Sequence, residues 1–166
     1  MCITHLFYST EKMRFLLKKG MIILAEYSYV LSQSIDSNGS AIFNDVIPCN
    51  RGLIYHRNES GIFVLRGIVN NPTQCFARYQ AIYNGNASIP TDGIAGPISI
   101  ALAVDGEAIN SSVAIVTPTT TNSLFNITST AIIDCPKGCC LNLSLKNLTD
   151  QTINLANSNL TITRIA

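Results

Sequence analysis

The sequence contains no tryptophan and little charge, since only 13% of its 166 residues are Asp, Glu, Lys or Arg. Hydrophobic residues make up 47%, so the chain is too apolar and too weakly charged for an intrinsically disordered protein. Its formal net charge of +1 provides no general attraction to nucleic acid or anionic membranes. No apolar run approaches the roughly 20 residues that a membrane-spanning helix needs. The length fits one domain.

Residues that carry catalysis are scarce as well. Of the two histidines, His56 has hydroxyl and acidic neighbours in Ser60 and Glu59. A catalytic triad requires its base to lie between the nucleophile and the acid that orients the base. Residues that follow one another on a single strand and turn, as His56, Glu59 and Ser60 do, are not arranged in this way. Four aspartates stand alone at turns: Asp92, Asp105, Asp134 and Asp150. We therefore expect no enzyme, and we expect His56 at a solvated strand end before a tight turn.

The six cysteines include one dense cluster, Cys135, Cys139 and Cys140. Its C-x3-C-C spacing differs from the C-x2-C that wraps zinc, and Cys139 and Cys140 would point to opposite faces of a strand. We expect Pro136–Gly138 to form a turn and the three thiols to be small core residues. A disulfide among the three cysteines is the alternative. The cluster predicts no metal site.

Other ligand classes lack their motifs too. There is no glycine-rich phosphate-binding loop, and the arginines are scattered without interleaved aromatic residues, which excludes a nucleic-acid-binding face. Oxygens at Thr91–Gly93 and Asp105-Gly106 suit calcium, but the repeated Asp spacing of a calcium loop is missing. We predict no metal and no cofactor, with calcium at these loops as the alternative.

What the sequence does contain is a hydrophobic period of two residues, typical of β-strands. The expected strands are Ala41–Val46, Leu53–His56, Gly61–Ile68, Cys75–Tyr83, Ile98–Val104, Val113–Val116, Leu124–Ile133, Leu141–Leu145 and Leu160–Ile165. Turn residues separate them at Asn38-Gly39, Asn84-Gly85, Asp105-Gly106, Pro118–Thr121 and Asn157–Asn159, among others. This spacing predicts an all-β sandwich or barrel of eight to ten antiparallel strands.

The first twenty residues differ from the rest of the chain. Met1–Gly20 carries four basic side chains against Glu11 alone, whereas the remaining residues are slightly acidic. The segment has three interpretations: a signal sequence, a basic amphipathic arm, or a leader that is not part of the natural protein. We favour the third, because Lys18-Lys19-Gly20 before Met21 must be encoded by a purine-rich stretch resembling a ribosome-binding site. The single domain then spans residues 21–166, with Met21 as the true start.

Two stretches resemble a known family. Gly96–Pro118 (GPISIALAVDGEAINSSVAIVTP) resembles a hairpin of the globular heads that cap bacterial collagen-like surface proteins, such as spore-surface glycoproteins, and Ser158–Ala166 (SNLTITRIA) resembles their closing strand. Related sequences occur in phage fibre proteins. The resemblance implies a jelly roll of the tumour-necrosis-factor and complement type, normally a homotrimer. The collagen stalk of those proteins is absent from this sequence.

Aromatic residues on the expected strands are candidates for the core or for a trimer interface: Phe63, Phe76, Tyr79, Tyr83 and Phe125. The expected strands Gly61–Ile68, Ile98–Val104 and Leu124–Ile133 are apolar on both faces. A monomeric sandwich needs only one apolar face per strand. We therefore expect the second apolar face of these strands to be buried between copies of the chain.

These expectations favour a non-enzymatic structural or adhesive domain, a trimeric head or fibre module on a phage particle, spore or bacterial surface. The alternative is a soluble module that binds a glycan or a protein receptor through its loops. The longest expected loop is Asn84–Gly96, with Asn84, Asn86, Thr91 and Asp92 as candidate ligand-binding residues.

Overall fold

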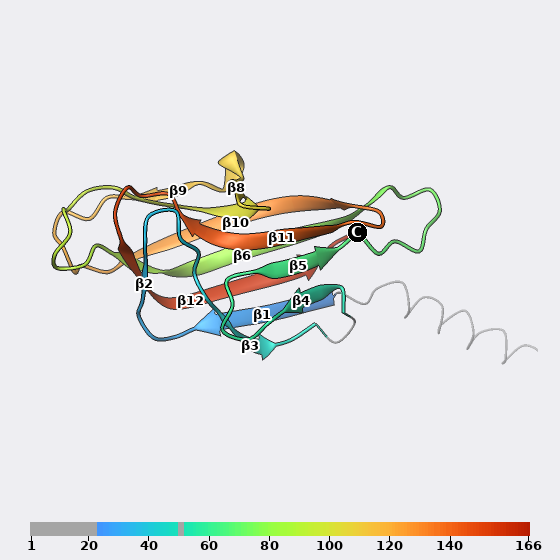
Figure 1. Ribbon diagram of the computed structural model, residues 1–166, viewed down its shortest axis with the longest axis horizontal. Coiled ribbons are helices and arrows are strands. Elements are labelled where there is room, and N and C mark those ends of the chain that lie inside the picture. The colour runs from blue at the N-terminus through green and yellow to red at the C-terminus, as the bar shows by residue number, and fades with distance from the viewer. Residues whose placement is uncertain (1–22, 50–51) are drawn as a thin grey trace, which may run out of the picture.

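The computed structural model describes residues 23–49 and 52–166. Two six-stranded antiparallel sheets pack face to face (Figure 1). This confirms the predicted all-β jelly-roll class. No helix in the described ranges is long and apolar enough to cross a membrane. The basic segment Met1–Gly20 and the expected start at Met21 lie outside the described residues.

The first sheet has the order β10-β6-β12-β1-β3, with β2 also paired to β12. Its strands are β1 (Ile23–Tyr29), β2 (Gln33–Ile35), β3 (Asn44–Ile47), β6 (Phe76–Ser88), β10 (Phe125–Pro136) and β12 (Ile153–Arg164). The second sheet has the order β4-β5-β11-β7-β8, with β9 also paired to β7. Its strands are β4 (Ile54–His56), β5 (Phe63–Arg66), β7 (Ile98–Val104), β8 (Glu107–Ala108), β9 (Ala114–Val116) and β11 (Cys140–Asn147), and the short 3-10 helix η1 (Asn110–Ser112) lies between β8 and β9.

Alternation of side chains builds the core between the sheets. In β10, every second residue from Ile127 to Cys135 is buried and the residues between them are exposed. The largest fully buried side chains include Tyr27, Phe43, Phe63 and Leu65. Each such side chain contributes about 1.5–3 kcal/mol through removal of apolar surface from water.

The expected turn at Asp105-Gly106 is confirmed, and it is the turn of a β-hairpin. It joins β7 to β8, and Val104 pairs with Glu107 directly across the turn. Both turn residues have positive φ, 51° for Asp105 and 89° for Gly106. This is the backbone of a type I′ turn, for which the sequence Asp-Gly is favoured.

The expected breaks at Asn84-Gly85 and Asn157–Asn159 are wrong, because β6 and β12 run straight through them. At Asn157, with φ of 50°, the β6–β12 register shifts in a bulge. A Cβ on Gly85 would lie 2.3 Å from the Tyr83 hydroxyl, so this glycine makes room for the Tyr83–Ser158 hydrogen bond of 3.1 Å. At these positions Gly85 and Asn157 lie within strands, where they allow close packing and a bulge, and they do not form turns.

The expectation of strands that are apolar on both faces holds for β7 alone. Its inner side chains join the core, and Ala101 and Ala103 on the other face are fully buried. The outward residues of β10 are instead polar except for Ile132 and the terminal Pro136, and in β5 the outward residues are half-buried Val64 and exposed Arg66. The sequence had suggested a surplus of apolar strand faces, and the structure shows no such surplus on β5 and β10.

Candidate functional site

The outer face of the first sheet is defined here as the side turned away from the core on β1, β12, β6 and β10. Polar side chains on it are hydrogen-bonded across neighbouring strands. Asn84 Oδ1 accepts bonds from Asn126 Nδ2 at 2.9 Å and Thr128 Oγ1 at 3.2 Å, and Asn159 Nδ2 donates to Glu26 Oε1 at 2.7 Å. Much of the hydrogen-bonding capacity of this face is therefore met within the sheet itself.

Three aliphatic side chains interrupt this polar face. Leu24 on β1, Ile82 on β6 and Ile132 on β10 are 41%, 40% and 54% exposed. Ile82 lies between Thr161 and Thr130 on the adjoining strands. The outer face is therefore a broad surface on which exposed aliphatic side chains lie among polar side chains, several of which are hydrogen-bonded to one another.

The candidate ligand-binding residues fall into two places. Asn84 and Asn86 lie within the second half of β6 on the outer face of the first sheet, so their assignment to a loop is wrong. Thr91 and Asp92 are exposed in the turn after Ile89, in the connection from β6 to β7. The loop is thus shorter than Asn84–Gly96, because strand pairing with β10 and β12 continues to Ser88.

An open groove lies beside this loop. Its volume is about 470 Å³, and its apolar lining comes from Ile94, Pro97, Ile115 and Leu148, with Asp150 and Gln151 among its polar residues. Ile94 and Ile115 are 80% and 66% exposed. Such exposed aliphatic side chains around a hollow are typical of a contact site for another molecule.

The loop is held in place by one amide side chain. The Ile94 amide donates to Gln151 Oε1 at 3.0 Å, and Gln151 Nε2 donates to the Ile94 carbonyl at 2.8 Å. A Cβ on Gly93 would lie 2.5 Å from Ile89 Cγ2, so glycine lets the loop close. The exposed Ile94 is therefore presented by an ordered loop. The sequence reasoning missed this residue, although an isolated isoleucine within a loop rich in Gly and Pro was a usable signal.

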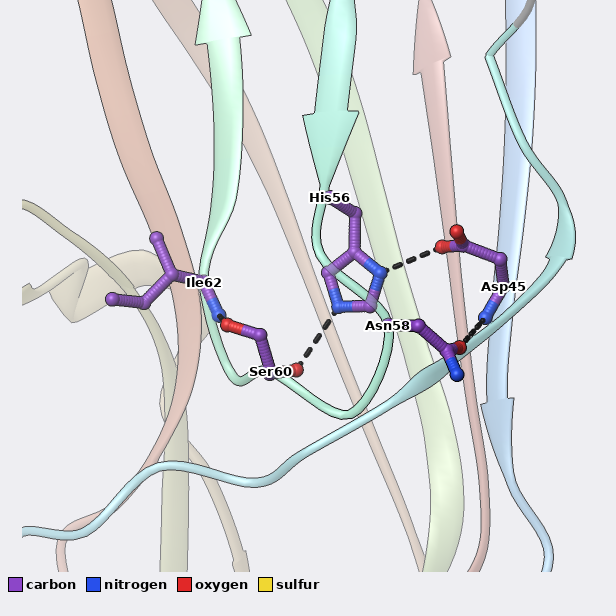
Figure 2. A network of polar contacts seen from close by, with 5 residues as sticks. All are labelled: Asp45, His56, Asn58, Ser60 and Ile62. Atoms are coloured by element: carbon purple, nitrogen blue, oxygen red, sulfur yellow. Dashed lines mark hydrogen bonds and ion pairs between the residues drawn. The ribbon is translucent and has the colours of Figure 1, made fainter.

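His56 lies in the polar network of Figure 2. Its Nδ1 is 2.6 Å from Asp45 Oδ1, and its Nε2 is 3.0 Å from the backbone oxygen of Ser60. The ring stacks on Phe63 at 4.4 Å and touches Tyr27 at 4.8 Å between ring centroids. The His56 side chain is 1% exposed. The expectation that His56 lies at a solvated strand end is wrong, because its ring points inward and packs at the margin of the core.

This network does not have the geometry of a nucleophile and its base. Both ring nitrogens of His56 already face oxygen atoms, and the one from Ser60 is a backbone carbonyl. The Ser60 hydroxyl instead accepts a hydrogen bond from the Ile62 amide at 3.2 Å. The network therefore joins segments of the fold and offers no activated hydroxyl.

The five aromatic candidates divide by depth. Phe63, Tyr79 and Tyr83 are fully buried in the core, whereas Phe76 and Phe125 are half-buried. The Tyr79 hydroxyl donates to the Arg66 carbonyl at 2.6 Å. Burial raises the pKa of Tyr79 and of Tyr83 to about 12. The three buried rings are therefore core residues and are not available to an interface.

The cysteine cluster is also divided. Pro136–Gly138 forms the expected turn, and Cys135 is buried, with Sγ 3.4 Å from the Leu65 carbonyl. Burial raises the pKa of the Cys135 thiol. Cys139 and Cys140 are exposed, so their placement in the core is wrong; Cys140 faces outward opposite Arg66. All three are free thiols in the structure.

Candidate metal ligands do not converge within residues 23–49 and 52–166: no group of three or more His, Cys, Asp or Glu side chains is placed to hold an ion. Asp105 Oδ1 accepts hydrogen bonds from the Asn142 amide and side chain at 2.9 and 3.1 Å. Asp92 lies apart from it in the β6–β7 connection. The two loops considered for calcium thus do not form a joint site.

The chain matches no family model, and no curated protein matches its sequence. Its fold is similar to those of many solved structures, three of which are named here. The Eiger TNF of S. frugiperda has a TM-score of 0.61 and 10% identity, and the match covers 87% of this chain and 93% of that chain. Murine APRIL has a TM-score of 0.59 and 11% identity, with 87% of this chain and 100% of that chain covered, and the globular domain of zebrafish complement 1qA has a TM-score of 0.56 and 8% identity, with 86% and 95% covered. At these identities the likeness establishes the fold, a jelly roll of the tumour-necrosis-factor and complement type.

Proposed function

We propose that this chain is a non-enzymatic structural or adhesive domain, displayed as a homotrimeric head or fibre module on a phage particle, spore or bacterial surface. The outer face of the first sheet is the observation that carries this proposal. In the heads that the sequence resembles, one sheet face packs against its copies around a threefold axis. Here that role falls to the face carrying Leu24, Ile82 and Ile132.

The composition of this face suits burial between copies. Several of its polar groups already have partners, as Asn84 does with Asn126 and Thr128, so covering these groups leaves few of their donors or acceptors unsatisfied. The exposed aliphatic side chains add about 25 cal/mol for each Å² removed from water. Both properties lower the cost of association.

The oligomeric state tests this proposal. We expect light scattering after gel filtration to give three times the mass of the chain, and Ile82→Arg to give a folded monomer because it places a charge at the centre of the interface. Ile62→Arg is the matched control, since Ile62 is similarly exposed (51%) and precedes β5 in the other sheet. A monomeric wild type, or an Ile82→Arg variant that stays trimeric, contradicts the trimer.

Location tests the display role. The proposal places the protein on the extracellular surface of a virion, spore or cell, so purified particles should contain it in stoichiometric amounts. Antibody labelling of intact particles is the measurement. Absence of the protein from purified particles contradicts display and favours the second candidate function.

The second candidate is a soluble module that binds a glycan or protein receptor through its loops. The groove beside Ile94 favours it, because Gln151 holds that loop in a fixed conformation and the exposed Ile115 lies on the groove wall. A glycan array, followed by titration of any hit, is the test. We expect Ile115→Arg to abolish binding and Ile62→Arg to retain it; binding that survives Ile115→Arg contradicts a role for the groove, and variants at Thr91 and Asp92 then test the loop itself.

A further inference from the structure

The groove beside the Ile94 loop has little free polar capacity. Gln151 uses both ends of its side-chain amide on the Ile94 backbone, at 3.0 and 2.8 Å. Thr149 Oγ1 accepts a hydrogen bond from the Ser99 amide at 3.0 Å and donates to the Ser99 carbonyl at 3.3 Å. These two lining residues therefore hold the groove together and have little left to offer a ligand.

Asp150 is the exception in the lining. It is exposed at the groove. Within residues 23–49 and 52–166, its carboxylate has neither a hydrogen-bond donor nor a basic side chain as partner. Hydrogen bonds to a charged group are about twice as strong as those between neutral groups, so a ligand gains most by meeting this carboxylate.

The turn that carries Asp150 is held on both sides by Asn147, which is 1% exposed. Its Nδ2 donates to the Ile35 carbonyl at 3.1 Å and to the Gln151 carbonyl at 2.9 Å, and its Oδ1 accepts a hydrogen bond from the Thr149 amide at 2.8 Å. The backbone on either side of Asp150 is thus fixed before any ligand arrives. Such preorganisation lowers the entropy lost on binding.

Four connections between strands meet at this end of the sandwich (Figure 1). The Asn122 amide donates to the Ile89 carbonyl at 2.7 Å, which joins the β9–β10 and β6–β7 connections. Ser37 Oγ donates to the Thr149 carbonyl at 2.7 Å, which joins the β2–β3 and β11–β12 connections. Gln151 links the β11–β12 connection to the β6–β7 loop through Ile94.

The charge on these connections has one sign. They comprise residues 36–43, 89–97, 117–124 and 148–152, and they contain Asp36, Asp92 and Asp150 but no Lys, Arg or His. Thr152 Oγ1 donates to Asp36 Oδ1 at 3.0 Å, which places a second carboxylate next to the turn of Asp150. A surface lined by one sign of charge attracts ligands of the opposite sign.

The groove walls distinguish between ligand classes. A sugar presents several hydroxyl groups, and each needs a partner when the water around it is displaced. The walls offer mainly Ile94, Ile115 and Leu148, and the lining includes no aromatic side chain. Aliphatic walls beside a carboxylate instead match a partner that carries aliphatic side chains and a cation.

We propose that the groove binds an extended polypeptide segment in which a Lys or Arg side chain accompanies an aliphatic one. The aliphatic side chain packs against Ile94 and Ile115, and the cation pairs with the Asp150 carboxylate. This inference rests on the second candidate function, and it narrows the ligand of that function from a glycan or protein to a basic, aliphatic peptide.

Three capped peptides test the proposal: acetyl-Ile-Ala-Lys-Ala-Ile-amide and its counterparts with Gln or Glu in place of Lys. NMR titration of the full chain, followed at the methyl groups of Ile94 and Ile115, measures their affinities. We expect the Lys peptide to bind about fivefold more tightly than the Gln peptide, as for an exposed ion pair, and the Glu peptide to bind most weakly. Equal affinities for the three peptides overturn the proposal.

Two variants locate the preference. Asp150→Asn should reduce binding of the Lys peptide to the level of the Gln peptide and leave the Gln peptide unchanged; the fold should be unaffected, because the Asp150 side chain is exposed and unpaired in the described ranges. Glu107→Gln is the matched control, since Glu107 is also an exposed acid but lies on β8, and it should keep the full preference. A preference for Lys that survives Asp150→Asn overturns the role of this carboxylate.

The outcomes separate this inference from the function on which it rests. A glycan that binds the wild type and is lost in Ile115→Arg, with no binding of the Lys peptide, overturns the inference and leaves the second candidate function in place. Absence of any ligand of either class at the groove overturns both. The oligomeric state and the presence of the protein on particles do not depend on these results.

Discussion

Two hydrogen-bonded side-chain pairs of nearly equal length lie in opposite environments. His56 Nδ1 and Asp45 Oδ1 are 2.6 Å apart at the margin of the core, and Arg78 Nε and Asp134 Oδ1 are 2.7 Å apart on the outer face of the first sheet. The His56 side chain is 1% exposed, whereas Arg78 and Asp134 are each 41% exposed. In the monomer, where the outer face of the first sheet is uncovered, water and salt screen the second pair and cannot reach the first, so similar distances imply very different contributions to stability.

The largest effect should come from His56→Ala. This variant removes a ring packed on Phe63 and Tyr27 and leaves the Ser60 carbonyl and Asp45 without their partner. We expect a loss of about 3 kcal/mol in the free energy of unfolding. Urea denaturation of the monomeric Ile82→Arg form measures it, and Arg78→Ala in the same background is the matched control, with no measurable change. Equal losses for the two variants would show that burial does not distinguish the pairs.

Asp45→Ala should have the next largest effect. The ring remains in place, but Nδ1 loses its hydrogen-bond partner in a site that water does not enter freely. We expect a loss of about 2 kcal/mol, less than for His56→Ala because Asp45 itself is partly solvated. Denaturation near pH 6 is the measurement. Asp134→Ala at the exposed pair should be indistinguishable from wild type, and a loss there equal to that of Asp45→Ala contradicts the comparison.

Salt should separate the pairs further. In double-mutant cycles at low ionic strength, we expect a coupling energy of about 1.5 kcal/mol for Asp45 and His56. At 1 M NaCl, where the Debye length is about 3 Å, this coupling should persist and any coupling between Arg78 and Asp134 should vanish. A buried coupling that disappears in salt would mean that the His56 site is open to ions.

The smallest effect should appear at acidic pH and concerns the Arg78–Asp134 pair. The hydrogen bond from Arg78 holds the pKa of Asp134 below its usual range. The stabilisation from this pair is therefore complete above the ordinary carboxyl value of about 3.9 and is lost as pH falls through the lower folded value. Carboxyl NMR titration of Arg78→Ala should return the Asp134 pKa to its ordinary value with no measurable change in stability near neutral pH. An unchanged Asp134 pKa would contradict the pairing.

Much of the fold was predictable because it depends on local pattern. The period of two identified nearly every long strand, and Asp105-Gly106 was correctly placed as a hairpin turn because its two residues favour positive φ. The same reasoning failed at Asn84-Gly85, where glycine accommodates the Tyr83 hydroxyl inside a strand. A residue that favours turns can equally mark a close packing contact, and the sequence does not distinguish the two.

The site was less predictable for the same reason. Asp45 is eleven residues from His56 and lies in the other sheet, and no spacing rule connects them. Gln151 is 57 residues from the Ile94 loop that it holds. Thr91 and Asp92 were correctly placed in a loop, but the neighbouring groove depends on side chains from three separate segments.

By itself the sequence determined the class of this protein: low charge, alternating hydrophobicity and turn residues at short spacing specify antiparallel strands around one core. It also determined which chemistry is scarce, since catalytic and metal-binding residues are few and dispersed along the chain. Only the tertiary structure decided that the outer face of the first sheet is polar and internally paired, that Ile94 is exposed on an ordered loop, and that His56 is buried. These features depend on contacts between residues far apart in the chain, which strand order and register create, and alternation along one strand carries no information about them.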